Sequence, residues 1–196
     1  MRADVDVLNA TRIETDNILG LWIAQDLDDP ARYAPFLLQG GLSMPDRDYY
    51  LDKSPSMDEA RGAFQAHIEA VLKLAGIPDP HAAAGRVYAL EMRIAAVHAT
   101  RTETMDVAKG NNHWRRADFD TRAPGMDWGR FLAAAGLGAQ QEFVVWHPGA
   151  VTGIAALVGN ASLDDWRSYL SFHALEHLGA VLPRAMVDED FHFYGT

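Results

Sequence analysis

Apolar residues recur at intervals of three and four along much of the chain, which is the spacing of an amphipathic helix. The first of two clear stripes predicts a helix from about residue 56 to residue 75, and the second predicts the helix that follows it. The stripes consist of Met57, Ala60, Phe64, Ile68, Val71 and Ala75, and of Val87, Leu90, Ile94 and Val97. Weaker patterns predict further helices at residues 5–18, 127–135, 148–158, 162–181 and 183–195.

Residues that start and end helices flank several of these stripes. Ser56–Glu59 has the S-x-x-E pattern of a capping box, in which the serine side chain and the glutamate each satisfy a free backbone N–H. Gly76 and Pro78 end that helix, because glycine favours the position just past a helix and proline cannot continue one. Ser162, three residues before Asp165, marks the start of another helix.

Two short runs near the N-terminus favour β-structure instead. Leu21–Ala24 and Tyr33–Leu38 are rich in β-prone residues and are separated by a polar, acidic turn, so they predict a hairpin. Pro35 places the second strand at the edge of its sheet, because proline has no N–H to donate to a neighbouring strand. Phe143–Trp146 is a further strand-like run, and residues 101–125 predict a long ordered connection with a short helical turn. The predicted fold is mainly α-helical with one small β-hairpin near the N-terminus.

Length, charge and composition narrow the class of protein. A chain of 196 residues is the usual size of one domain, so residues 1–196 are expected to form a single helical domain. The net charge of -10 argues against nucleic acid or an anionic membrane as a partner. The absence of cysteine excludes disulfides and thiolate metal sites. Met1–Asp6 is charged where a signal peptide would be apolar, and no apolar run approaches the length of a membrane span.

The least generic run in the chain is Gly40–Leu51, whose sequence is GGLSMPDRDYYL. Its two glycines permit a tight turn, and Pro45 restricts the backbone that follows. Asp46 and Asp48 flank Arg47, an arrangement that suits a charge-assisted hydrogen-bonded corner. We expect a rigid structural junction here, with Arg47 buried between its two carboxylates.

The same run resembles the G-G-L-G-[LM]-P-D-R-D-Y-Y-L signature of the neprilysin family of zinc metallopeptidases, and it is most similar to the bacterial endopeptidase branch. Ser43 stands where the family usually has a third glycine. Further segments match family patterns in the family's order. They are Ala89–Ala95 with His98 and Arg101, Asp127-Trp128 with Phe131-Leu132, Trp166 with Tyr169-Leu170 and Phe172-His173, and Phe191–Gly195. The family has an asparagine in a Y-N-x-M context where this chain has Asn111 and Asn112 without the tyrosine.

The resemblance implies the non-catalytic, mostly helical cap domain of a zinc-dependent endopeptidase, and an incomplete part of that domain. In the family this domain encloses the chamber that limits substrates to peptides. The family's zinc motifs, H-E-x-x-H and E-x-x-x-D, occur nowhere in this sequence. The resemblance therefore implies zinc in the full-length enzyme and none bound by this segment, with no catalytic, metal or cofactor residues here. The implied partners are the catalytic domain of the same chain and peptide substrates, without nucleic acid or membrane contact. The implied location is periplasmic, in the cell envelope or secreted, and the chain looks cut at both ends.

One run nevertheless has the form of a metal site. His173–His177 is a literal H-x-x-E-H, the inverted zinc motif, and Glu176 lies beside the two histidines on one helix. A catalytic zinc needs a third protein ligand, and only nineteen residues follow His177. The helix is also apolar around much of its circumference, so both histidines are expected to be packing residues.

Three functions remain open at this point. The first is the inert cap portion of a larger peptidase, and the second is a free-standing helical interaction module without catalysis. The third is a hydrolase that uses His173–His177. The encoded sequence beyond Thr196 separates the first two, because an H-E-x-x-H motif there supports the peptidase and a stop codon supports the module.

Overall fold

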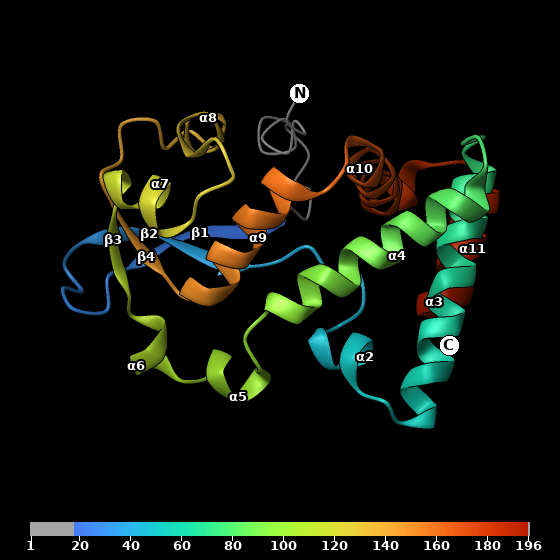
Figure 1. The fold of residues 1–196 in the computed structure, drawn as a ribbon, viewed down its shortest axis with the longest axis horizontal. Helices are drawn as coiled ribbons and strands as arrows, with labels where there is room; N and C mark the ends of the chain where they lie inside the picture. The colour runs from blue at the N-terminus through green and yellow to red at the C-terminus, as the bar shows by residue number, and fades with distance from the viewer. Residues whose placement is uncertain (1–17, 196) are drawn as a thin grey trace. The chain divides into compact units, whose positions relative to one another are not determined.

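The computed structural model describes residues 18–195, in which the chain divides into two compact units (Figure 1). The first unit contains residues 42–96 and 161–195, and the second contains residues 18–41 and 97–160. The chain is mainly α-helical, as the sequence predicts. The helix predicted for residues 5–18 lies outside the described residues, except for Ile18.

The described part of the second unit holds a four-stranded sheet in the order β1-β2-β4-β3. β1 (Leu19–Gln25) and β2 (Tyr33–Gln39) form the predicted antiparallel hairpin. β4 (Glu142–Val145) covers most of the predicted Phe143–Trp146 run and pairs in parallel with β2. β3 (His113–Arg115) pairs antiparallel with β4 and was not predicted, because three residues are too few for a recognisable alternation.

The prediction that Pro35 places β2 at a sheet edge is wrong, because β2 lies between β1 and β4. Pro35 is paired with Ile23 of β1. The ladder from β2 to β4 begins one residue later, at Phe36 opposite Val144. No strand therefore requires an N–H from Pro35, and the proline is compatible with an interior strand.

The described part of the second unit also contains several helices, most of them short. They are α5 (Arg101–Thr104), α6 (Val107–Gly110), η1 (Arg116–Asp118), α7 (Phe119–Arg122), α8 (Trp128–Ala134) and α9 (Pro148–Asn160). Residues 101–125 thus contain several short helices and a strand, where the sequence predicted one helical turn. α9 packs against β2 (Figure 1).

Aromatic rings join the sheet of the second unit to its short helices. The ring of Phe119 lies 5.2 Å from Trp114, 4.6 Å from Trp128 and 5.3 Å from Phe143, measured between centroids. Asn112 adds a polar tie, since its Nδ2 donates to the carbonyl of Val145 at 3.1 Å and its own carbonyl accepts from the N–H of Val145 at 2.7 Å. Asn112 thus fixes the start of β3 against β4, which gives this asparagine a structural role.

The first unit is helical in its described residues. It contains α2 (Arg47–Leu51), α3 (Pro55–Leu74), most of α4 (Pro80–Val97), α10 (Leu163–Leu178), η2 (Gly179–Val181) and α11 (Arg184–Tyr194). Its core gathers the apolar stripes of α3 and α4, including Phe64, Ile68 and Val87, together with Phe172 of α10. The stripes that predicted these helices therefore are their buried faces.

The N-terminus of α10 lies where the sequence predicts it, whereas that of α3 does not. At α10 the predicted capping box is present, with Ser162 Oγ accepting from the N–H of Asp165. α3 begins earlier than predicted, with Ser54 as the cap and Pro55 in the first turn, so Ser56–Glu59 is not a capping box. The fixed φ of proline suits the first helical position, and this explains the earlier start.

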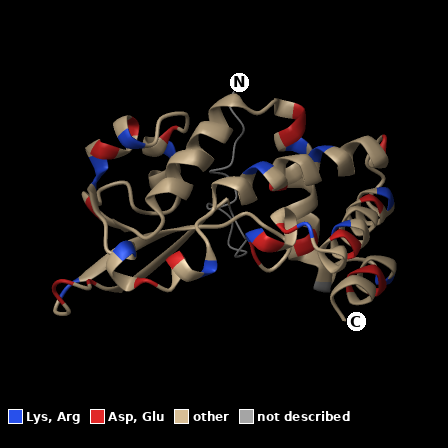
Figure 2. Ribbon diagram, turned by 60° about the horizontal axis from the view of Figure 1, so that its bottom comes forward, with Lys and Arg blue, Asp and Glu red and all other residues tan. Residues whose placement is uncertain are grey.

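Charged residues are spread over both units. Acidic residues lie on most helices and at the turn between β1 and β2, with basic residues interspersed (Figure 2). Within residues 18–195, no helix is long and apolar enough to cross a membrane.

Candidate functional site

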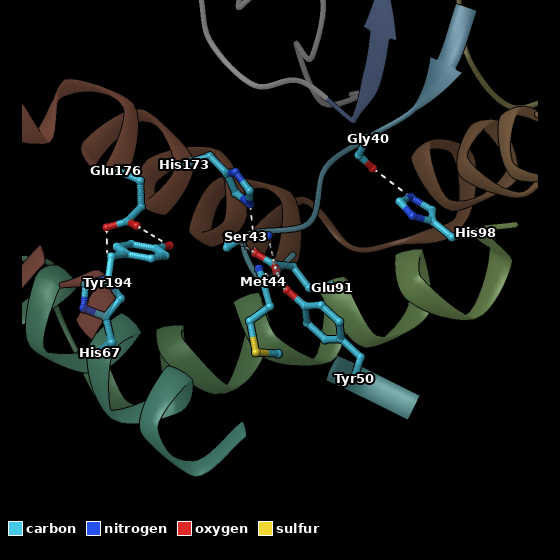
Figure 3. Close-up of polar contacts among 10 residues, drawn as sticks. All are labelled: Gly40, Ser43, Met44, Tyr50, His67, Glu91, His98, His173, Glu176 and Tyr194. Atoms are coloured by element: carbon cyan, nitrogen blue, oxygen red, sulfur yellow. Dashed lines mark hydrogen bonds and ion pairs between the residues drawn. The ribbon is translucent and has the colours of Figure 1, made fainter. Parts of the chain in front are cut away.

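A buried carboxylate, Glu91, is the centre of the polar structure in the first unit. Glu91 lies on α4 and is 0 % exposed. Its Oε1 accepts from Ser43 Oγ at 2.9 Å and from His173 Nε2 at 2.9 Å. Its Oε2 accepts from the N–H of Ser43 at 3.1 Å and from the hydroxyl of Tyr50 (Figure 3). These four residues, here called the Glu91 cluster, join α4 to α10 and to the Gly40–Leu51 run.

Tyr50 connects the cluster to the backbone of the corner. Its hydroxyl accepts from the N–H of Met44 at 3.0 Å while it donates to Glu91 (Figure 3). Burial raises the pKa of the Tyr50 hydroxyl well above its usual range, and the charge and hydrogen bond of Glu91 raise it further. Tyr50 therefore keeps its proton and remains a donor to the carboxylate.

The corner itself differs from the prediction at Arg47. Arg47 is only partly buried, and its Nε lies 3.4 Å from the carbonyl oxygen of Ala95. Among the described residues no ion pair joins Arg47 to the neighbouring carboxylates, and Asp46 instead caps α2 by accepting from the N–H of Asp48. The guanidinium buried beside the corner belongs to Arg61, whose Nη1 donates to the carbonyls of Tyr49 at 2.9 Å and Asp52 at 2.6 Å.

A second polar group surrounds His67 on α3. The His67 ring lies between Glu176 of α10, 3.2 Å from Nε2, and Glu189 of α11, 3.2 Å from Nδ1. It also stacks on Phe193 with ring centroids 4.5 Å apart. Tyr194 donates to the other oxygen of Glu176 at 2.9 Å (Figure 3). His67 thus ties α3 to both C-terminal helices of the unit.

Opposing effects act on the pKa of His67. Burial lowers it, whereas the hydrogen bond and charge of Glu176, followed by those of Glu189, raise it, and the net change is upward. Burial also raises the pKa of the nearby Asp190 carboxyl, with a further contribution from the charge of Glu176. The surroundings of His67 therefore favour the imidazolium form, which can donate to both glutamates at once.

His67, Glu176, Glu189, Phe193 and Tyr194 are here called the His67 group. Several of them line a groove of about 900 Å³ in the first unit. Met44 and Pro45 of the corner form one part of its wall, and Glu189 and Phe193 of α11 form another. α3 lines it with small side chains, Ala60, Ala63, Ala66 and Ala70, and with His67. The lining of the groove is thus mainly apolar and includes the ionisable side chains of His67, Glu189 and His192.

The H-x-x-E-H run does not act as one unit in this arrangement. His173 contacts Glu91, whereas Glu176 contacts His67 and Tyr194 (Figure 3). Two groups of potential metal ligands occur among residues 18–195, and neither contains His173 or His177. One is His67, Glu176 and Asp190, and the other combines Asp26 and Asp28 of the β1–β2 turn with His113 of β3.

The role of Glu91 was not predicted from the sequence, where this residue stands out only as part of a family-like helix. Glu91 nevertheless lies on the buried stripe of α4, four residues after Val87 and three before Ile94. A carboxylate at such a position must be desolvated, so it requires hydrogen-bond donors. That pattern pointed to a buried polar centre, but the donors come from distant segments that the sequence could not assign.

Comparisons with known proteins agree with this architecture. A structure of the zinc metalloprotease Zmp1 of Mycobacterium tuberculosis in complex with an inhibitor matches with a TM-score of 0.89 and 26% identity, over 97% of this chain and 29% of that one. A structure of the same protease in an open state matches with a TM-score of 0.89 and 27% identity, over 97% of this chain and 30% of that one. PepO from Lactobacillus rhamnosis HN001 shares the fold, with a TM-score of 0.74 and 12% identity, over 96% and 30%.

This chain therefore spans less than a third of the length of these solved relatives. A model of the N-terminal part of peptidase family M13 matches residues 5–196. The match covers nearly the whole sequence, and the similar structures include two of a zinc metalloprotease. The chain belongs to peptidase family M13, the neprilysin family that its motifs resemble.

Proposed function

We propose that this chain is the cap portion of a zinc-dependent endopeptidase and helps to enclose the chamber in which peptides are cleaved. The observation that carries the proposal is the family match over residues 5–196, combined with a sequence that contains neither H-E-x-x-H nor E-x-x-x-D. Family membership supports a peptidase, and the absence of both motifs from this sequence supports a catalytic centre in another part of the polypeptide.

The H-x-x-E-H run at His173–His177 does not fit a catalytic zinc. A catalytic site needs three converging protein ligands and an open position. Within the H-x-x-E-H pattern, His173 contacts Glu91 on α4, whereas Glu176 contacts His67 on α3. The segment alone is therefore expected to be inactive, with zinc held by the catalytic part of the complete enzyme.

In this proposal the Glu91 cluster and the His67 group are structural. They join α3, α4, α10 and α11, the helices that make up most of the first unit. The partners of the segment are then the catalytic part of the same polypeptide and peptide substrates. An exported or envelope location is part of the proposal, because peptidases of this family act there.

Peptide cleavage by two purified proteins tests the proposal. The complete enzyme should cleave peptides, lose activity to a zinc chelator and contain zinc after dialysis. The 196-residue chain should cleave nothing and retain no stoichiometric zinc. A 196-residue chain that cleaves peptides with bound zinc, and loses both through His177→Ala, would support the hydrolase based on His173–His177 instead.

A further inference from the structure

The outer edge of β1 exposes apolar side chains, and the proposed function as a cap does not explain this exposure. β1 is the first strand in the sheet order, and among residues 18–195 no strand pairs with its outer side. Its sequence, LGLWIAQ, contains no charged residue and no proline. Trp22 is 57% exposed and Ile23 is 58% exposed. Proteins usually protect an edge strand with charges, proline, a bulge or a covering segment, and β1 lacks the sequence-based protections.

The register shows which backbone groups of β1 face outward. Across the hairpin, the N–H of Asp26 donates to the carbonyl of Arg32 at 3.0 Å, so these residues form a hydrogen-bonded pair. Hydrogen-bonded and non-hydrogen-bonded pairs alternate along an antiparallel ladder. Trp22, four residues before Asp26, therefore directs its peptide groups towards β2, whereas Leu21 and Ile23 direct theirs outward.

The opposite side of β2 gives the same alternation. The N–H of Trp146, which follows β4, donates to the carbonyl of Leu37 at 2.9 Å, so the peptide groups of Leu37 face β4. Those of Phe36 then face β1, where Phe36 is paired with Trp22. Among residues 18–195, no strand pairs with the outward peptide groups of β1, which include those of Leu21 and Ile23.

The side chains indicate the conformation of what covers this edge. Consecutive strand residues point to opposite faces, so Trp22 and Ile23 expose apolar surface on both faces of the sheet. A helix packed on one face would leave the other side chain and the outward peptide groups in water. An added strand satisfies all of them, because its backbone pairs with the edge and its side chains lie on both faces.

We propose that an extended, mainly apolar segment of the same polypeptide, outside these 196 residues, pairs with β1 as a fifth strand in the complete peptidase. The inference rests on the proposed function, in which this chain is one part of a longer enzyme. The chain covers only 29% and 30% of the two mycobacterial structures, so relatives of that length have ample polypeptide for the segment. A permanent partner also suits the edge, since an uncovered apolar edge promotes aggregation.

Hydrogen exchange in the complete, substrate-free enzyme tests this pairing at single-residue resolution. The amides of Leu21 and Ile23 should exchange about a hundredfold or more slowly than unpaired amides, because a fifth strand accepts from both. Exchange at unpaired rates in the complete enzyme would overturn the proposal. Protection that requires a bound peptide inhibitor, or that depends on protein concentration, would also overturn it, in favour of a peptide substrate or a second copy respectively.

A proline substitution provides a second, independent measurement. Ile23→Pro removes an outward N–H and leaves the β1–β2 ladder intact, whereas Ile23→Thr keeps both the N–H and the branched side chain. Ile23→Pro should abolish the protection of Leu21 while Trp22 stays protected, and Ile23→Thr should preserve both. Equal Leu21 protection in the two variants would overturn the pairing. Peptide cleavage by the same wild-type preparation separates the two proposals, since an active zinc enzyme with an unprotected edge contradicts only this one.

Discussion

Replacement of Glu91 by alanine tests whether the buried carboxylate holds the first unit together. Glu91→Ala removes the common acceptor of four hydrogen bonds and leaves donors of Ser43, Tyr50 and His173 without their partner. A buried donor left unsatisfied costs about 1–3 kcal/mol, and Glu91→Ala leaves four donors without their acceptor. Because the donors share one acceptor, their costs are not additive, and we expect a loss of about 3–5 kcal/mol.

Thermal melting followed by circular dichroism measures this loss. For a chain of this size, about 1 kcal/mol corresponds to about 2–4 °C, so the melting temperature should fall by about 6–20 °C. Glu69→Ala is the matched control. Glu69 on α3 also pairs with a histidine, His81, at 2.8 Å, but that pair is exposed to solvent, and its removal should leave the melting temperature unchanged.

The two variants separate the explanations. If Glu91→Ala and Glu69→Ala melt at the same temperature, the cluster contributes no more than an exposed pair and the reasoning is refuted. Tyr50→Phe gives an intermediate case, because it removes one donor to Glu91 and the acceptor of the Met44 N–H. Its loss should be about 1–3 kcal/mol, measured by urea unfolding.

Three further predictions use the same measurements. Arg61→Ala should lower the free energy of unfolding in urea by about 1–3 kcal/mol, because the buried Arg61 guanidinium donates to two carbonyls. Arg47→Ala should lower it by less than about 1 kcal/mol, and the reverse order would restore the expected role of Arg47. Gly110→Ala should lower the melting temperature, since a Cβ there would lie 2.4 Å from the Trp146 ring, and an unchanged melt would contradict this packing. The raised pKa of His67 should stabilise the fold fully below about pH 6.5, and the stabilisation should disappear as the pH rises through the folded pKa. A wild-type melting temperature that exceeds that of His67→Ala equally at pH 6 and pH 9 would exclude this linkage.

Local information in the sequence was sufficient for the helices and the hairpin. The stripes on α3 and α4 have the helical period over several turns, so burial of one face requires a helix whatever its neighbours are. The hairpin of β1 and β2 likewise depends on two adjacent runs and their turn. Family motifs distributed along the chain added the expectation of a peptidase cap, and residues 5–196 match that family.

The tertiary structure alone decided the pairings between distant segments. The partners of Glu91 lie 41, 48 and 82 residues away, and β2 meets β4 only after more than a hundred residues. Such contacts depend on where the helices carry each side chain, which neither periodicity nor capping residues specify. For this reason the sequence placed Arg47 between its immediate neighbours and grouped Glu176 with the nearby His173. In the folded chain, Arg61 supports the corner, and Glu176 and His173 contact residues on two different helices, because packing of distant elements determines which buried polar groups can meet.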